Sequence, residues 1–131
     1  MVYFSKDGEW GKQQEVLILP IVKEHFGKEI KQSEDTYAKH DYYCDECNYE
    51  VKSRKCKIAT YDTTMITMNK MVGDKPLWLI FNYLDCIAVI QYEEEKFAKF
   101  YKEPFSRAGY EWDKKEHVYI PRNHLTIIHR K

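Results

Sequence analysis

The spacing of apolar residues near the N-terminus predicts a helix over Glu9–Phe26. A glycine, Gly27, follows directly and is typical of a helix end, while Pro20 interrupts the pattern and favours a kink. Four residues share one face of this helix: Glu15, Leu19, Val22 and Phe26. Glu15 therefore stands at the end of a face that is otherwise apolar. An ordinary surface carboxylate, stabilised by the helix macrodipole, is an equally good interpretation.

Short runs after this helix predict strands joined by turns. Glu29–Ser33 fits a short strand, and the polar segment Ser33–Lys39 fits a loop. Tyr42–Cys44 and Asn48–Ser53 fit the two strands of a hairpin. The pattern thus places three strands directly after the first helix.

The middle of the chain predicts a short helix followed by two strands. Thr63 or Thr64 can cap a helix that runs through Met71 and is closed by a glycine. Leu77–Phe81 is continuously apolar, as in a strand buried on both faces, and Cys86–Tyr92 fits the next strand.

The last third of the chain is less regular. Glu93–Lys102 fits a charged surface helix or loop, and Pro104–Lys115 carries no clear signal. His117–Ile120 fits a strand that Pro121 stops, and the apolar tail Leu125–Ile128 is expected to pack on the body of the protein. The predicted order is helix, three strands, helix, two strands and a variable tail. This order indicates an α/β or α+β fold with a mixed sheet.

Length and composition favour a single packed domain. The chain has 131 residues, of which 44% are hydrophobic and 15% aromatic, a composition that excludes a disordered chain. The longest apolar run, Val16–Val22, contains a proline and is too short to span a bilayer, so no membrane association is expected. The chain opens without a charged and then apolar leader, so we expect an intracellular protein.

The charges balance, with 21 lysines and arginines against 21 aspartates and glutamates. Dedicated nucleic-acid binders usually carry a basic surplus, because neutralising phosphates drives their binding. The neutral sum counts mildly against DNA as a partner. A carboxylate cluster and a basic rim would, however, cancel in the total.

The expected hairpin brings charged residues to one face. If the hairpin turns at Asp45–Glu46, Asp41 lies opposite Glu50, with Cβ atoms about 4.5–5.5 Å apart. Lys52 is two residues beyond Glu50 and points to the same face. Two carboxylates and an ammonium group therefore converge without any assumption about tertiary structure.

This arrangement suits a hard divalent cation. Mg²⁺ takes oxygen ligands, often one or two carboxylates with substrate phosphate and water, and the backbone carbonyl of Val51 could add a ligand. A lysine beside such an ion can orient or deprotonate an attacking water. The alternative is a solvated hairpin in which Asp41 and Glu50 pair with Lys39 and Lys52.

In their context these residues resemble the PD-(D/E)XK nuclease superfamily, whose restriction-endonuclease-like core has the element order αβββαβ. Its features are an acidic residue on the first helix, another on the second strand, and Glu-x-Lys on the third strand. They match Glu15 in GKQQE, Asp41 in KHDYY, and Glu50 and Lys52 in YEVKSR. The chain departs from the motif at one point, since no proline precedes Asp41.

The resemblance covers about residues 9–92 and leaves 93–131 as a C-terminal extension of one domain, 1–131. It implies a Mg²⁺- or Mn²⁺-dependent endonuclease that hydrolyses phosphodiester bonds, mostly in DNA. Small stand-alone members resemble resolvases, repair nucleases or phage and viral endonucleases. Branched or structured DNA is therefore an expected substrate, and the nucleus or a viral factory joins the cytoplasm as an expected location. A homodimer stays open, because the sequence carries no dimer signature.

The resemblance also implies roles for individual residues. Asp41 and Glu50 would hold the metal, Lys52 would serve the attacking water, and Glu15 would bind a second metal or its water shell. Five basic residues would contact DNA phosphates: Lys12, Arg54, Lys55, Lys57 and Lys70. For each of the five, a solvated surface charge is an equally good interpretation.

The cysteines and histidines suggest no separate site. Cys44 and Cys47 would lie opposite each other, on the face of the hairpin away from the two carboxylates. Tetrahedral zinc needs four ligands, and only Cys56 and Cys86 remain, so free and partly buried thiols are favoured over zinc or a disulfide. His40 would point away from the carboxylates if the strand began there, so no role is assigned to it.

Two other functions stay open. One is a non-catalytic nuclease-like module that binds nucleic acid or protein. The other is a small zinc-stabilised interaction domain.

Overall fold

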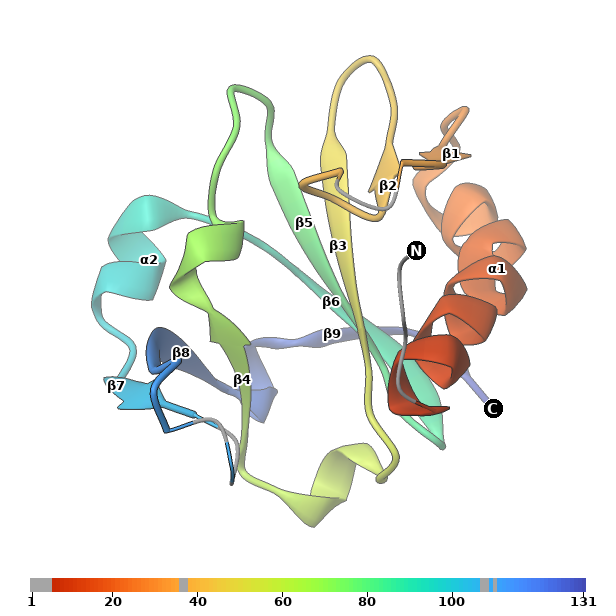
Figure 1. Ribbon diagram of the computed structural model, residues 1–131. Helices are drawn as coiled ribbons and strands as arrows, with labels where there is room; N and C mark the ends of the chain where they lie inside the picture. The colour runs from red at the N-terminus through yellow and green to blue at the C-terminus, as the bar shows by residue number, and fades with distance from the viewer. Residues whose placement is uncertain (1–5, 36–37, 107–108, 110) are drawn as a thin grey trace.

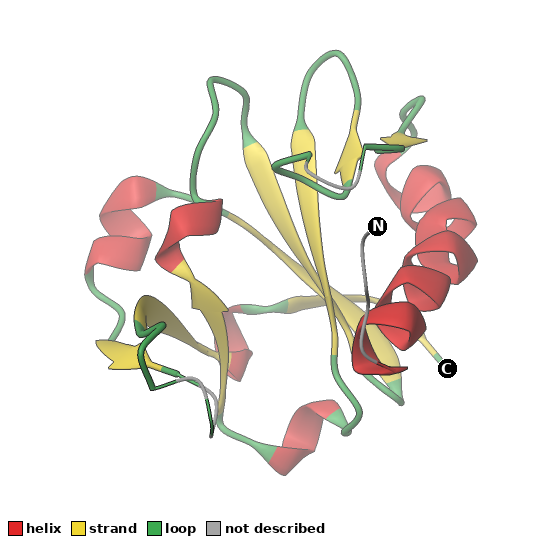
Figure 2. Cartoon of the chain, viewed as in Figure 1, coloured by secondary structure: helices red, strands yellow, loops and turns green. Residues whose placement is uncertain are grey.

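The described part of the protein is a mixed α+β structure with one long helix and two sheets. The computed structural model describes residues 6–35, 38–106, 109 and 111–131. Helix α1, Lys6–Phe26, packs along one face of the large sheet, and the small sheet lies with helix α2 on the other face (Figure 1). Figure 2 shows how little helix the chain contains beyond α1. The expected mixed α+β class is confirmed.

The large sheet has six strands and is mixed. In spatial order these are β1 (Lys31–Gln32), β2 (Tyr42–Tyr43), β3 (Asn48–Ser53), β5 (Leu77–Asn82), β6 (Cys86–Gln91) and β9 (Thr126–Arg130). Strands β3 and β5 are parallel, and every other neighbouring pair is antiparallel. The apolar tail Leu125–Ile128, which was predicted to pack on the body of the protein, largely falls within β9, the last strand of this sheet.

The small sheet has three strands in the order β4 (Thr63–Thr67), β8 (Lys115–Pro121) and β7 (Lys102–Phe105). Four short helices complete the described chain: η1 (Ile58–Thr60), η2 (Met68–Lys70), α2 (Glu94–Ala98) and η3 (Arg122–His124). The predicted strand His117–Ile120 lies within β8.

The helix predicted to start at Thr63 or Thr64 and run through Met71 is wrong. The segment forms strand β4 and then the single turn η2. Its residues alternate between the core and the surface, with Thr64 and Ile66 buried, and β-branched residues favour strands. The connection between the parallel strands β3 and β5 therefore passes through the second sheet instead of a helix.

Two apolar cores fill the two faces of the large sheet. The core under α1 includes Ile18, Val22, Tyr42, Tyr49, Val51, Ile80 and Val89. The core under the small sheet includes Ile66, Leu79, Phe81, Ala88, Phe97, Val118 and Ile120. Strand β5 contributes to both cores, which confirms the prediction of a strand buried on both faces. No helix in the described part of the chain is long and apolar enough to cross a membrane.

The placement of β4 predicts that substitutions at its buried and exposed positions change the free energy of unfolding by different amounts. Ile66 is 2% exposed, so Ile66→Ala should lower the free energy of unfolding by about 2–4 kcal/mol. Thr63 is exposed, so Thr63→Ala should change it by less than about 0.5 kcal/mol. Urea denaturation measures both values. Similar small effects at the two positions would show that the Ile66 side chain does not pack in the core between the two sheets.

Candidate functional site

The hairpin register predicted from the sequence is confirmed. Tyr42 pairs with Tyr49 and Tyr43 with Asn48, which are the pairs that bring Asp41 level with Glu50. Strand β2 covers only this end of β3. Among the described residues, the edge of β3 beyond Glu50 has no strand partner on the β2 side.

Asp41 and helix α1 lie at this open edge of β3. The Val51 amide donates a hydrogen bond to Asp41 Oδ2 at 2.8 Å, which replaces a bond to a neighbouring strand. The buried Tyr42 hydroxyl donates to the backbone carbonyl of Glu15. This second bond fixes the turn of α1 that carries Glu15 against the start of β2.

Glu50 is the most enclosed charged group of the site, with 3% of its surface exposed. Three cationic or titratable side chains surround its carboxylate: Lys52 Nζ at 3.6 Å, Lys70 Nζ at 3.8 Å and His40 Nδ1 at 3.5 Å. These separations are ion-pair contacts, longer than ordinary hydrogen bonds. The buried Oε2 atom of Glu50 has no hydrogen-bond partner in the described structure.

Asp41 shares its surroundings with two other acidic groups. Burial and the nearby charges of Glu50 and Glu15 raise the pKa of the Asp41 carboxyl to about 8. A hydrogen bond with the Glu15 carboxyl also favours protonated Asp41, whereas the Val51 amide bond opposes it. The Lys12 Nζ atom lies 3.4 Å from Glu15 Oε2. Among the described residues, no cationic side chain lies within 4 Å of Asp41.

His40 belongs to this site, although the sequence assigned it no role. Strand β2 begins at Tyr42, so strand alternation does not set the direction of His40. Its Nε2 lies 3.0 Å from the Val72 carbonyl, which can only accept, so Nε2 carries a proton and Nδ1 faces Glu50. The Glu50 carboxylate raises the pKa of His40. His40 is therefore held beside Glu50, where the carboxylate favours its protonated form.

The site offers a pair of carboxylates rather than a complete ligand cage. Within the described residues, no group of three or more His, Cys, Asp or Glu side chains is arranged to hold a metal ion. Mg²⁺ needs only one or two protein carboxylates, with water and substrate oxygens supplying the rest. An unpartnered buried oxygen on Glu50 and a carboxyl on Asp41 that lacks a counter-charge match this requirement.

The basic residues predicted to contact DNA lie in different surroundings. Lys70 and Lys12 pair with the carboxylates of the site. Lys55 is exposed and lies 5.0 Å from the Trp10 ring, and Lys57 is exposed just before η1. Strand β3 ends at Ser53, so neither lysine lies on it.

Arg54 is half-buried between the two sheets. Its guanidinium donates to the Met65 carbonyl of β4 and lies 5.9 Å from the centre of the Phe81 ring. Burial lowers its pKa. This residue connects β3 to the second sheet instead of standing on an outer rim.

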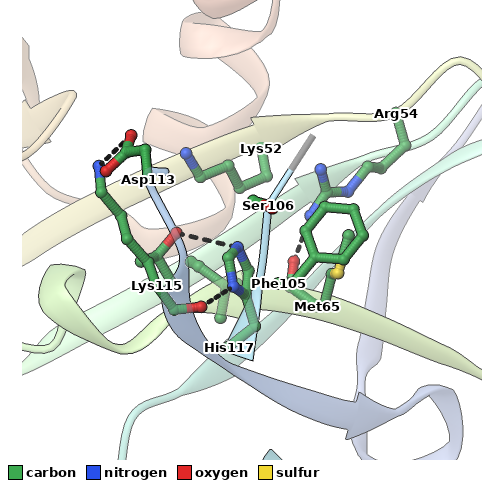
Figure 3. A pocket seen from close by; sticks show the side chains of 10 residues that line it. Lys52, Arg54, Met65, Phe105, Ser106, Asp113, Lys115 and His117 are labelled. Atoms are coloured by element: carbon green, nitrogen blue, oxygen red, sulfur yellow. Dashed lines mark hydrogen bonds and ion pairs between the residues drawn. The ribbon is translucent and has the colours of Figure 1, made fainter. Parts of the chain in front are cut away.

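A polar cavity of about 480 Å³ opens next to Lys52, between β3 and the small sheet. Its walls combine basic, hydroxyl and apolar side chains (Figure 3): Lys52, Arg54, Met65, Ile66, Thr67, Phe105, Ser106, Asp113, Lys115 and His117. Lys52 belongs both to this cavity and to the carboxylate site. No sequence pattern predicted the cavity, because half of its lining comes from the segment without a clear pattern and from β8.

The four cysteines are free thiols. The Cys44 amide bonds the Cys47 carbonyl at 2.9 Å, so the two residues oppose each other across the turn as predicted. Both are buried in the core under α1, and Cys44 Sγ lies 3.7 Å from the Tyr49 hydroxyl. Cys86 is buried in the other core.

Comparisons with protein-family models, with curated proteins and with solved structures found no match to this chain. The functional assignment therefore depends on the chemistry of its own residues.

The raised pKa of Asp41 predicts a pH-dependent gain in stability for Asp41→Asn in the presence of a chelator. The folded-state pKa lies above the unfolded value, so the Asp41 contribution to stability is present below about pH 4 and lost as the pH rises through about 8. Asparagine keeps an acceptor for the Val51 amide but never ionises. The variant should equal the wild type near pH 4 and exceed it by about 1 kcal/mol near pH 9.

Thermal melts at the two pH values measure this difference. Asp45→Asn, at an exposed position of the same hairpin, is the matched control and should show the same difference at both. An Asp41→Asn variant that loses stability at high pH would contradict the electrostatic picture.

Proposed function

We propose that this protein is a divalent-metal-dependent endonuclease that hydrolyses phosphodiester bonds in DNA. The observation that carries the proposal is the meeting, at the open edge of β3, of Glu15 from α1, Glu50 from β3 and Asp41 from the loop before β2. Lys52 lies 3.6 Å from Glu50. Burying like charges together costs stability, so their convergence calls for a function.

Each residue of the site has a chemical task in this proposal. Asp41 and Glu50 would hold Mg²⁺ or Mn²⁺, with the Val51 carbonyl as a further oxygen donor and Glu15 for a second ion or its waters. The ion would supply charge stabilisation at the scissile phosphate. The Lys52 ammonium would orient the attacking water and donate a hydrogen bond to the developing negative charge. His40 would keep the Glu50 carboxylate in place.

The element order supports a restriction-endonuclease-like core in part. Helix α1, strands β1 to β3 and the parallel strand β5 follow the order αβββ…β of the PD-(D/E)XK superfamily. The departure is the crossover, where β4 and η2 stand in place of the second helix. The carboxylate site lies before this departure in the chain, so it depends only on the part that agrees.

A non-catalytic binding module is the second candidate, and one observation favours it. The charge of Glu50 is already matched by Lys52 and Lys70, with His40 beside them, as in a structural ion cluster. Calorimetry with Mn²⁺ separates the two functions. A nuclease should bind the ion near pH 7 with release of about one proton from Asp41, and Asp41→Asn should abolish the heat. Identical heats for the variant and the wild type would favour the module.

Replacing Lys52 tests the catalytic assignment. Lys52→Ala should lower the cleavage rate of supercoiled or branched DNA by about 10²-fold or more with Mg²⁺ or Mn²⁺, because it removes the group that serves the attacking water. The control is Lys99→Ala, since Lys99 is exposed and lies outside the site. The expected result requires both variants to melt like the wild type. Undiminished cleavage by folded Lys52→Ala would reject the assignment.

A further inference from the structure

The cavity between the two sheets carries an excess of positive charge. Lys52, Arg54 and Lys115 line it together with His117, and Asp113 is the acidic residue of its wall. Asp113 lies 3.6 Å from Lys115 and offsets that charge in part. A cavity of about 480 Å³ falls within the range of small-molecule sites. Its chemistry therefore favours an anionic ligand of modest size.

Arg54 gives the strongest indication of an anion. Arg54 is half-buried in the cavity wall, where its guanidinium lies between the Met65 carbonyl and the Phe81 ring. Burial lowers its pKa. The charge interactions that oppose this shift come from Tyr83 and Cys56, not from a carboxylate. Among the described residues no carboxylate pairs with Arg54, and a phosphate can accept from a guanidinium through two parallel hydrogen bonds. In the structure, the Arg54 guanidinium donates a hydrogen bond to the Met65 carbonyl.

The opposite wall presents an aromatic surface. Phe105 lines the cavity and is 39% exposed, so its ring is accessible to a ligand. Its ring centre lies 5.5 Å from that of His117 at an interplanar angle of 82°. His117 is fixed through the Lys115 carbonyl at 2.7 Å and the Thr67 hydroxyl at 3.3 Å (Figure 3). An exposed ring on a fixed support is suited to stack against a planar ligand.

Lys52 joins the cavity to the carboxylate site. Its ammonium lies 3.6 Å from Glu50 Oε1, while its side chain forms part of the cavity wall. A nucleic-acid strand whose scissile phosphate lies at the carboxylates can therefore place an adjoining nucleotide in the cavity. A base inside a duplex is already stacked on both faces and cannot contact Phe105. An unpaired base can do so.

We infer, taking the proposed nuclease function as given, that the cavity binds one unpaired nucleotide beside the cleavage site. The phosphate contacts Lys52, Arg54 and Lys115, and the base stacks on Phe105. The substrate class is accordingly nucleic acid with a single-stranded segment, such as a flap, a loop or a branch point. The small sheet, which carries Phe105 and Lys115, recognises that single-stranded segment.

Fluorescence anisotropy with a labelled oligothymidylate, in the presence of a chelator, tests this site without any cleavage. Phe105→Ala and Lys115→Ala should each weaken binding about tenfold, because one removes base stacking and the other a phosphate contact. Phe105→Tyr keeps an aromatic ring and should bind like the wild type. Lys99→Ala is the matched control for loss of one exposed lysine. A blunt duplex should bind more weakly than the single strand, and Phe105→Ala should not change its affinity.

Unchanged oligothymidylate binding by folded Phe105→Ala and Lys115→Ala would overturn the inference, and so would equal competition by inorganic phosphate and thymidine monophosphate. The proposed function fails separately. If Lys52→Ala cleaves like the wild type while the Phe105 and Lys115 variants lose binding, the nucleotide site stands and the catalytic assignment does not. The reverse pattern leaves the nuclease without this site.

Discussion

The repulsion among carboxyl groups at the open edge of β3 is the constraint on which the candidate site depends. Glu15 and Glu50 are buried, and Asp41 lies between elements that bring both close to it. In a medium of low dielectric constant these charges cannot all persist without a cation. The molecule responds in two ways, by surrounding Glu50 with His40, Lys52 and Lys70 and by favouring the protonated form of Asp41. A divalent ion would relieve the remaining repulsion.

The second sheet gives this edge a particular setting. Because β4 replaces a helix in the crossover, the face of β3 that carries Lys52 looks toward β8 and β7 and not toward a helix. The result is a polar cavity where a helix would have placed apolar packing. Arg54 crosses this interface to bond β4, so it couples the two sheets and also lines the cavity. The proposed catalytic site and the proposed nucleotide site therefore share Lys52, which contacts Glu50 on one side and lines the cavity on the other.

Local patterns predicted the elements that carry the carboxylates. The helical period around Glu15 and the position of the turn at Asp45–Glu46 were sufficient to place Asp41 level with Glu50. The helix predicted over Thr63–Met71 was wrong because threonine is both a common helix cap and a β-branched residue that favours strands. Pairing with the distant strand β8 makes this segment a strand. His40 was missed because its direction depends on a contact with the Val72 carbonyl. The cavity was missed because its walls meet only through long-range strand pairing.

The most direct test of the central claim is the anomalous diffraction of a crystal soaked in Mn²⁺. The account predicts a peak between the carboxylates of Asp41 and Glu50, within coordinating distance of both and close to Lys52. Occupancy should increase as the pH is raised, since the metal competes with the proton on Asp41. An absence of density there at high pH and high Mn²⁺, or a peak at Cys44 and Cys47 instead, would contradict the claim that this edge is a metal-dependent site.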